Sequence, residues 1–419
     1  MKKLLVLFVM ISVVVTFSFA ETVELWSWRT QDAEVWEEVE KQLQEEGEDI
    51  EIEFRAFLPT EYDSKMLLAL QSGKGPDLVY TRRLPGGRTK ALVDAGQLLP
   101  LTDKVDFQHF TEGVLNNITQ GNDYYGVPFA VQVTGIFYNK DIFDEYNLEE
   151  PDSWDELLAI AETLKTNGVD PFFVTGKEAW ALVMQHAMCG VSVLGPGWIK
   201  RLAEGKIDFL DQDWIYMNRL LNDLKEYYQK GFMANDTNDM NSAFAFGQAG
   251  MVFYGVWGVQ MWRELNPDLN IGYFMVPPDW EGNKPYAYVY MDGAIGMSSN
   301  ADNKEAAEKV LEFVATPEFG TIFSNITLNI PAVTGAEMPD SAILRETNQT
   351  AEDHASPYVY WVGSEFVTGK PSLYGDVMSP GLQEMYSNRI TPRELAQNAQ
   401  DALSQWYEPL IERLNTLED

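Results

Sequence analysis

The stretch from Val23 to Tyr80 alternates between two hydrophobic periods, and this alternation restricts the fold more than any other feature of the sequence. Residues 23–28, 50–55 and 77–80 show the apolar alternation, or the short apolar run, of β-strands. The two segments between them place apolar residues at the helical period. This order predicts an α/β fold with mainly parallel sheets. The helical faces consist of Val35, Trp36, Val39 and Leu43 in the first segment and of Tyr62, Met66, Leu67 and Leu70 in the second.

Strand and helix patterns continue along the rest of the chain. Ser153 and Glu156 fit a capping box, in which each side chain satisfies a free amide of the first helical turn. The helix that they open should end at Asn167-Gly168, a common C-terminal signal. The other expected elements are a strand pair or one long crossing strand over residues 127–138, a strand over 292–297, a helix over 303–315 and a mostly helical tail over 392–417.

The N-terminus carries the three-part pattern of a secretory signal peptide. A basic start, Met1-Lys2-Lys3, precedes an apolar run over residues 4–19, which ends in the small-x-small sequence Ser18-Phe19-Ala20. The run is shorter than the roughly 20 residues that a membrane-spanning helix needs. We therefore assign residues 1–20 to a signal peptide that is cleaved after Ala20.

The single cysteine, Cys189, excludes an intramolecular disulfide. It lies far from the cleavage site, so we expect no lipid-anchor cysteine there and a free protein in a periplasmic compartment. Its apolar neighbours predict a small buried hydrophobe.

Length and charge restrict the domain count and the partners. The mature chain of 399 residues (419 minus 20) is too long for one hydrophobic core, which indicates two domains. The formal charge of the whole chain is −34. Nucleic acid and anionic membrane surfaces are therefore poor partners, because like charges repel. The same charge disfavours a phosphorylated ligand, unless a local basic pocket overrides the total.

We find no motif for a metal, a cofactor or a catalytic residue, and we expect none. The three histidines do not form a His-Glu-x-x-His pair, and one cysteine cannot build a thiolate site. The acidic segment 236–239 lacks the turn glycine and the distal glutamate of a calcium loop, so we interpret it as a solvated loop. A carboxylate pair that cleaves glycosidic bonds stays open, because 64 acidic residues allow many pairs.

Several segments together resemble a known family, in its order and over nearly the whole mature chain until about Phe323. The chain is similar to the extracellular solute-binding proteins of ABC importers, specifically the large sugar-binding group that includes maltose-binding proteins. The segments are Glu24-Leu25-Trp26-Ser27-Trp28, Ser72-Gly73-Lys74-Gly75-Pro76-Asp77-Leu78-Val79, Tyr125-Gly126-Val127-Pro128-Phe129-Ala130-Val131-Gln132, Phe137-Tyr138-Asn139-Lys140, Pro151-Asp152-Ser153-Trp154, Phe246-Gly247-Gln248-Ala249-Gly250-Met251, Gly255-Val256-Trp257, Asp292-Gly293-Ala294-Ile295 and Asn303-Lys304-Glu305-Ala306-Ala307.

The resemblance implies a periplasmic-binding-protein fold of two α/β lobes joined by crossover strands, with a ligand cleft between them. The first lobe would contain residues 21–130 and 277–324, and the second residues 131–276 and 325–419. The implied function is capture of a mono- or oligosaccharide by hinge closure and its delivery to the membrane subunits of an ABC importer. We expect a monomer, because each molecule has its own cleft.

A buried sugar needs paired donors and acceptors for its hydroxyls and a flat aromatic ring for its apolar face. Aromatic and polar residues at strand ends and on loops are therefore the candidates. Gln132 is an amide where the maltose-binding group often has a carboxylate, and Trp257 matches a position where the family stacks a ring on the sugar. The predicted ligand-binding residues are Trp28, Arg29, Arg82, Arg83, Gln132, Tyr254, Trp257, Tyr290, Asp292 and Gly293, with Trp361 and Tyr374 as alternatives for one further ring and Trp180 as an additional candidate.

Alternatives remain open for several of these residues. Trp28, Trp257 and the tyrosines can instead belong to the core, and Arg82 and Arg83 can be exposed loop residues. A secreted carbohydrate-active enzyme is the competing function. The same fold could also bind a polyol or an anionic solute, which Arg29, Arg82 and Arg83 would favour if all three point inward.

Overall fold

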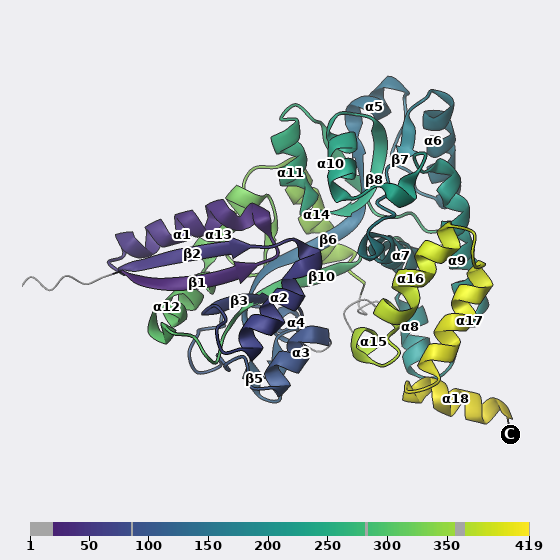
Figure 1. Cartoon of the computed structure of the whole chain (residues 1–419). Coiled ribbons are helices and arrows are strands. Elements are labelled where there is room, and N and C mark those ends of the chain that lie inside the picture. The colour runs from purple at the N-terminus through teal and green to yellow at the C-terminus, as the bar shows by residue number, and fades with distance from the viewer. Residues whose placement is uncertain (1–19, 85–86, 281–283, 357–364, 419) are drawn as a thin grey trace, which may run out of the picture.

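The computed structural model describes residues 20–84, 87–280, 284–356 and 365–418 and has two bodies joined by long strands (Figure 1). This arrangement confirms the predicted two-lobed α/β fold. Residues 1–19 of the predicted signal peptide and the candidate Trp361 lie outside the described residues.

One nine-stranded sheet runs through both bodies in the order β2-β1-β3-β10-β6-β8-β7, and β9 and β11 also pair with β6. A separate small sheet joins β4 and β5. The strands are β1 (Glu21–Ser27), β2 (Ile50–Ala56), β3 (Leu78–Thr81), β4 (Thr119–Gln120), β5 (Asp123–Tyr124), β6 (Val127–Asn139), β7 (Asp170–Phe172), β8 (Ala249–Gly255), β9 (Ile271–Phe274), β10 (Val289–Met297) and β11 (Ile330–Pro331).

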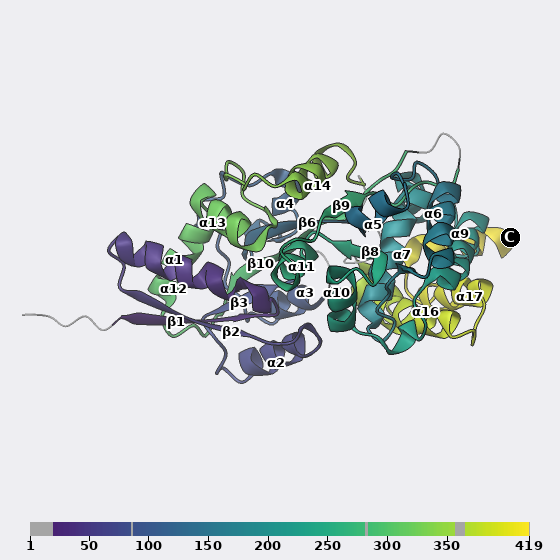
Figure 2. The same cartoon turned by 90° about the horizontal axis from the view of Figure 1, so that it is seen from above.

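Helices cover the part of the sheet formed by β1, β2 and β3. Viewed from above, α1 and α13 lie on one side of these strands and α2 lies on the other (Figure 2). The elements of this body are α1 (Ala33–Glu45), α2 (Pro59–Gln71), α3 (Gly87–Asp94), α4 (Glu112–Leu115), α12 (Lys304–Val314) and α13 (Pro317–Thr327), with a 3₁₀ turn η1 (Thr30–Asp32).

The second body is mostly helical and contains β7, β8 and β9 (Figures 1 and 2). Its helices are α5 (Lys140–Glu145), α6 (Trp154–Thr166), α7 (Ala179–Val193), α8 (Pro196–Ala203), α9 (Gln212–Leu224), α10 (Thr237–Ala245), α11 (Gly258–Leu265), α14 (Ala342–Asp353), α15 (Glu365–Thr368), α16 (Ser379–Tyr386), α17 (Pro392–Leu403) and α18 (Glu408–Glu418), with short turns η2 (Lys225–Tyr227) and η3 (Phe232–Ala234) and a π-helical turn η4 (Leu373–Met378).

Strand β6 belongs to both bodies. Its first half, residues 127–133, pairs with β10, and its second half, residues 134–139, pairs with β8 and β9. The sequence left open whether this region forms a strand pair, and the structure shows one long crossing strand. Gly135 in its middle allows a close approach, because an added Cβ would lie 2.8 Å from the carbonyl oxygen of Phe274.

The strand pairs divide by direction. The pairs β1–β2, β1–β3 and β7–β8 are parallel, as the alternation of strands and helices predicts. The ladders that β6 and β10 form within the described residues are antiparallel. The parallel prediction therefore holds for strands connected by a helix, whereas the strands that cross between the bodies pair in the opposite sense.

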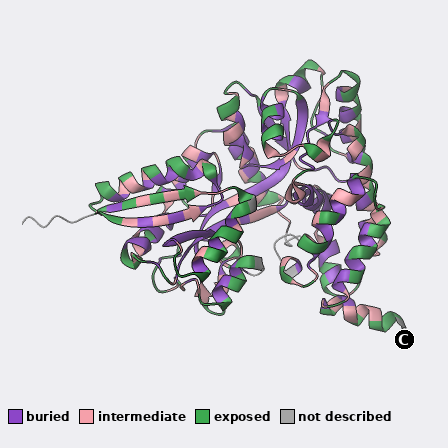
Figure 3. Cartoon of the chain, in the orientation of Figure 1, coloured by how far each residue is buried: buried purple, intermediate pink, exposed green. Residues whose placement is uncertain are grey.

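Three clusters of buried side chains form the core. Much of β6 and of α7 is buried (Figure 3). Met291, Ala332 and Val333 pack in the cluster of the first body, whereas Tyr288 packs in a cluster of the second. Ile330 also packs in a cluster of the second body, so β10 and residues 330–333, which follow the predicted boundaries at 277 and 325, contribute to both cores. A change in the middle of a strand leaves no turn signal in the sequence. The division into lobes at those residues stays a prediction.

Local sequence signals explain several helix ends. Ser153 caps α6 by accepting from the Glu156 amide, but the Glu156 carboxylate accepts from Asp152 instead of from Ser153, one residue outside the predicted box. Asp236 and Asp239 form a true capping box at the start of α10, so the acidic segment is a helix start and not the loop that we predicted.

One predicted helical face needs a correction. In α2, Tyr62, Met66 and Leu70 are buried, but Leu67 is 38% exposed. The apolar stripe at the helical period passes beside Leu67, because positions 62, 66 and 70 already form one i, i+4 row.

Among the described helices, α7 and α8 are the ones to consider as a membrane span. No individual helix in the described residues is long and apolar enough to cross a membrane, and α7 with α8 meets the criteria of length and composition only as a pair bent by 97°.

Candidate functional site

Six of the predicted ligand residues lie together where β1 and β3 end beside β10. Trp28 and Arg29 follow β1, Arg82 and Arg83 follow β3, and the other two, Tyr290 and Asp292, belong to β10. The parallel pairing of β1 with β3 brings both strand ends to one edge of the sheet, and β10 pairs antiparallel with β3 at the same edge. Ligands of open α/β sheets bind at the carboxyl ends of the strands.

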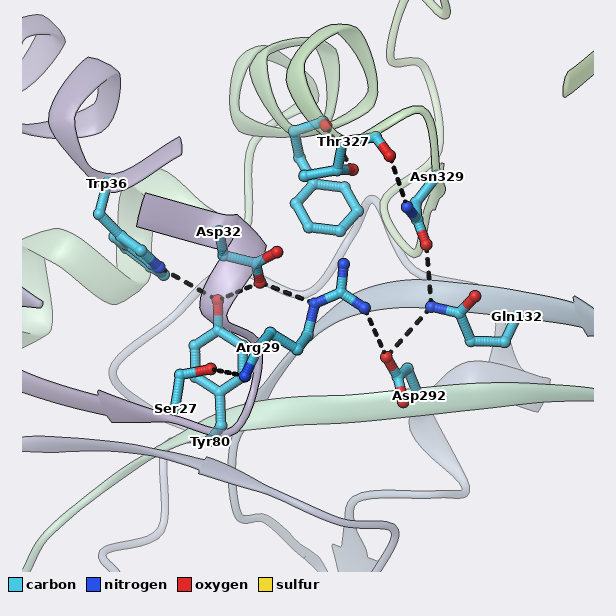
Figure 4. Close-up of polar contacts among 10 residues, drawn as sticks. Ser27, Arg29, Asp32, Trp36, Tyr80, Gln132, Asp292, Thr327 and Asn329 are labelled. Atoms are coloured by element: carbon cyan, nitrogen blue, oxygen red, sulfur yellow. Dashed lines mark hydrogen bonds and ion pairs between the residues drawn. The ribbon is translucent and has the colours of Figure 1, made fainter. Parts of the chain in front are cut away.

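Arg29 is held by carboxylates inside the protein (Figure 4). Its Nε lies 2.8 Å from Asp32 Oδ2 and its Nη1 lies 2.9 Å from Asp292 Oδ2. Tyr80 donates its hydroxyl to Asp32 as well, at 2.9 Å. Burial disfavours both charges and raises the pKa of Asp32, but the two carboxylates together raise the pKa of Arg29 above its ordinary value. Arg29 is 3% exposed, and this burial favours a structural role.

Gln132 links three segments that run between the bodies (Figure 4). Its Nε2 on β6 donates to Asp292 Oδ2 on β10 and to Asn329 Oδ1 just before β11, both at 3.1 Å. The side chain is 0% exposed, and its Oε1 is buried without a hydrogen-bond partner in the described residues. The amide that we expected at a sugar hydroxyl is thus occupied by protein partners.

The two other arginines lie against aromatic rings. The Arg82 guanidinium carbon is 3.5 Å from the centroid of the Trp28 ring, and the Arg83 guanidinium carbon is 4.6 Å from the Tyr290 ring. Burial lowers the pKa of Arg82, which the charge of Asp292 partly offsets. Trp28 is 7% exposed, so its ring supports Arg82 and leaves little surface for a ligand.

Gly293 allows β10 to lie close to β3 and to the Trp28 ring. A Cβ on this residue would lie 2.4 Å from the Thr81 carbonyl oxygen and 2.8 Å from the Trp28 ring. A larger residue would therefore push β10 away from β3 and from Trp28. The role that the structure supports for Gly293 is close packing of the two strands.

Aromatic residues of the second body form another group. Tyr254 on β8 is 7% exposed and lies 4.9 Å from Trp257 and 6.4 Å from Trp180, measured between ring centroids. Trp257 is partly exposed and directly precedes α11. Of these three rings, Tyr254 is the one that packing encloses, and Trp257 keeps surface that a ligand could cover.

Tyr374 connects the second body to the arginines. This residue of η4 is partly buried, and although burial raises its pKa, the charges of Arg88, Arg82 and Arg83 act in the opposite direction. Tyr374 therefore lies near the arginine pair. Arg88 was not predicted. It forms an ion pair with Asp63, and the signal that could have identified it is a third arginine shortly after the predicted strand.

Other reactive groups lie away from this region. Cys189 is fully buried in α7, as predicted, and burial raises the pKa of its thiol. His186 in the same helix is buried too, and burial lowers the pKa of its ring to about 3. Within the described ranges, no group of three or more His, Cys, Asp or Glu side chains is placed to hold a metal ion.

Known proteins similar to this chain include receptors of several bacteria. The Multiple sugar-binding protein of Streptococcus mutans is 27% identical over 285 residues, which cover 65% of this chain and 66% of that protein. The matches with the next two curated relatives cover 61% and 58% of those proteins, so all three alignments span less than two thirds of the relative.

Solved structures show the same fold over most of the chain. The apo form of RafE from Streptococcus pneumoniae has a TM-score of 0.71 at 20% identity, with 94% of this chain and 98% of that one covered. The GacH receptor of Streptomyces glaucescens has a TM-score of 0.76 at 16% identity, with 93% and 98% covered.

A family model gives the broader assignment. The model of the bacterial extracellular solute-binding proteins matches residues 26–320, which include the end of β1, all of β3, β6 and β10 and every strand-end residue described above. The segments that resemble sugar-binding receptors lie within or close to this range. The chain belongs to the family of bacterial extracellular solute-binding proteins.

Proposed function

We propose that the protein is a receptor that captures a mono- or oligosaccharide and delivers it to an ABC importer. Family membership supports a binding role, and two relatives are named for sugars: the Multiple sugar-binding protein and the Arabinooligosaccharide-binding protein of Halalkalibacterium halodurans. RafE has been solved with raffinose and GacH with acarbose. The observation that carries the proposal is the gathering of arginines and aromatic rings at the strand ends of the first body, near Tyr374 of the second.

In this proposal the ligand contacts come from both bodies. Arg82 and Arg83 donate hydrogen bonds to the sugar, and Tyr374 and Trp257 offer ring surface to its apolar face. Tyr290 supports Arg83 and stacks on Tyr288. Trp28, Arg29, Gln132, Tyr254, Asp292 and Gly293 hold these residues in place, as their burial and internal contacts support.

The proposed mechanism contains no covalent step. The ligand bridges the two lobes and favours a closed state by binding it more tightly than the open one. The hinge would be formed by β6, β10 and the segment before β11, the strands that Gln132 joins. The closed form would then dock on the membrane subunits of the importer.

The remaining assignments follow from the same proposal. We propose secretion into a periplasmic or extracellular space, with cleavage after Ala20, because the family is extracellular and the sequence begins with a signal-peptide pattern. We also propose that the protein acts as a monomer and has no enzymatic activity.

Thermal unfolding of the mature protein against a panel of sugars, polyols and anions tests the proposal. A ligand that binds only the folded state raises the melting temperature in a concentration-dependent way. We expect a rise with one sugar class and complete recovery of that sugar afterwards. Consumption of the sugar would support the enzyme instead, and a rise with a non-sugar solute alone would contradict the substrate assignment.

Replacement of Trp257 locates the site. We expect Trp257→Ala to weaken sugar binding by roughly tenfold or more, because a stacked ring loses both its buried area and its aromatic contact. Phe246→Ala is the matched control, since Phe246 lies in the same body and is 61% exposed. Equal binding by both variants would remove Trp257 from the site.

A further inference from the structure

Arg82 and Arg83 have donors that the protein does not use. Within the described residues, the Arg82 guanidinium forms no hydrogen bond or ion pair and contacts the Trp28 ring, whereas the Arg82 carbonyl accepts from Thr89. Arg83 donates Nη1 to the Met291 carbonyl at 3.0 Å, but its buried Nε has no partner there. Buried donors without acceptors are uncommon in folded proteins, so the Arg83 Nε–H indicates a missing acceptor, which the unpaired guanidinium of Arg82 can share.

The charges around the site do not balance. Arg29 with Asp32 and Asp292 sums to −1, and Arg82 with Arg83 adds +2, so the group carries +1 in a chain of net charge −34. The nearby Arg88 is neutralised by Asp63. Asp292 is the acidic group that acts most strongly on Arg82, yet its Oδ2 already accepts from Arg29 and from Gln132.

We infer that the ligand is an acidic sugar, with a uronic-acid unit whose carboxylate is bound by Arg82 and Arg83. This inference rests on the proposed sugar-binding function and specifies its substrate class. A neutral sugar needs hydrogen-bonding groups but no excess cation, and a partly buried cation without a counter-ion is costly. A bound carboxylate supplies both the missing acceptor and the missing charge.

The geometry favours a carboxylate among anions. Arginine presents N–H donors in a planar fork that matches the two oxygens of a carboxylate. Each guanidinium is held by an aromatic ring beneath it, so its edge keeps one orientation before the ligand arrives. The excess of one positive charge equals the charge of one carboxylate, whereas a phosphate dianion would leave a negative charge uncompensated. Tyr290 supports Arg83 and stacks on Tyr288, so Tyr374, which lies near the same arginines, is the ring proposed for the sugar itself.

Calorimetric titration with matched pairs of sugars tests this inference. The mature protein is titrated with galacturonic acid and galactose, with glucuronic acid and glucose, and with the corresponding disaccharides and trisaccharides. We expect the acidic member of at least one pair to bind at least tenfold more tightly than the neutral member, with an affinity that falls as salt is added. Tighter binding of the neutral member would overturn the acidic substrate and leave the proposed function standing. Absence of binding by every sugar would overturn both.

Variants assign the preference to the arginines. Arg82→Gln should reduce binding of the acidic sugar by tenfold or more and abolish the preference over its neutral partner, and Arg83→Gln should act in the same direction. Arg55→Gln, which removes a half-exposed arginine of β2, should change neither. Thermal unfolding without ligand verifies that each variant is folded. An unchanged preference in both folded variants would overturn the assignment, and the wild-type comparison holds even if one variant does not fold.

Discussion

Arg29 and Arg82 occupy equivalent places, each one or two residues past the end of a neighbouring parallel strand, and yet their surroundings differ. Arg29 forms ion pairs with two carboxylates, one of which belongs to a residue 263 positions away. Arg82 lies on the Trp28 ring without an ion pair in the described part of the chain. Two nitrogens of Arg29 are therefore held by carboxylates, with Nη2 buried and unpaired in the described residues, whereas the whole Arg82 guanidinium retains its donors for a further partner.

The difference shows that position at a sheet edge does not by itself make a ligand residue. An arginine whose charge is matched inside the protein belongs to the internal structure, because its removal would leave buried carboxylates uncompensated. An arginine held by an aromatic ring is oriented without being neutralised. Ligand contacts are then expected at arginines whose charge the protein does not neutralise.

The largest expected effect is on stability, in Arg29→Met. The change leaves the buried carboxylate of Asp32 and the nearby Asp292 without their common counter-ion. Removing one partner of a buried ion pair costs about 3–5 kcal/mol, because a buried charge stays uncompensated. Urea-induced unfolding of the whole protein, followed by tryptophan fluorescence, measures the loss.

Arg55→Met is the matched comparison for that loss. Arg55 also pairs with two carboxylates, those of Glu24 and Glu53, but it is 49% exposed. Exposed pairs contribute about 0–1 kcal/mol, so this variant should unfold nearly like the wild type. Similar losses in both variants would mean that the compensated network around Arg29 has no special structural role.

The next effect concerns the strands that join the bodies. Gln132→Leu keeps the approximate size of the side chain but removes the donor shared by Asp292 and Asn329. We expect a loss of about 1–3 kcal/mol, since buried acceptors are left unpaired. If the amide also holds the hinge, small-angle scattering should show a wider range of lobe separations without sugar. A stability loss with unchanged scattering would assign Gln132 to packing alone.

Much of the fold could be predicted from the sequence, because periodicity reports burial directly. The strand that begins at Glu21, the helix after Ser153 and the strand over 292–297 lie where the pattern places them. The pattern could not give the direction of β6 and β10, since antiparallel crossing depends on how the chain returns between bodies. It also could not identify Asp236 as a helix cap, because an acidic cluster has the same composition in a loop.

The site could be predicted less well, for a physical reason. The sequence places Arg29, Arg82, Gln132 and Asp292 at strand ends, and the structure brings them close to one another. Whether a side chain already has a hydrogen-bond partner inside the protein depends on distant residues. Asn329, the partner of Gln132, lies 197 positions further along the chain. Local patterns do not contain such pairings, so residues of the structural network and residues with free donors look alike in the sequence.

The smallest expected effect involves a carboxyl group that no arginine compensates. Glu346 on α14 lies where burial and the charge of Glu150 raise its pKa to about 7. Because the folded-state pKa is raised, the protonated form is favoured in the folded state. The contribution to stability is therefore present below the unfolded-state pKa and is lost as the pH rises to about 7 and above.

The size of this loss should be at most about 1 kcal/mol, since solvent screens a partly exposed group. Urea unfolding at about pH 5 and about pH 8 should show the decrease in the wild type but a smaller decrease in Glu346→Gln, which cannot ionise. The control is Glu318→Gln, an exposed residue whose replacement changes the net charge equally. If the control flattens the pH dependence as much as Glu346→Gln does, the effect belongs to the overall negative charge of the protein. A specific effect of Glu346 would show that a carboxyl without an arginine responds to pH, in contrast to the carboxylates that Arg29 compensates.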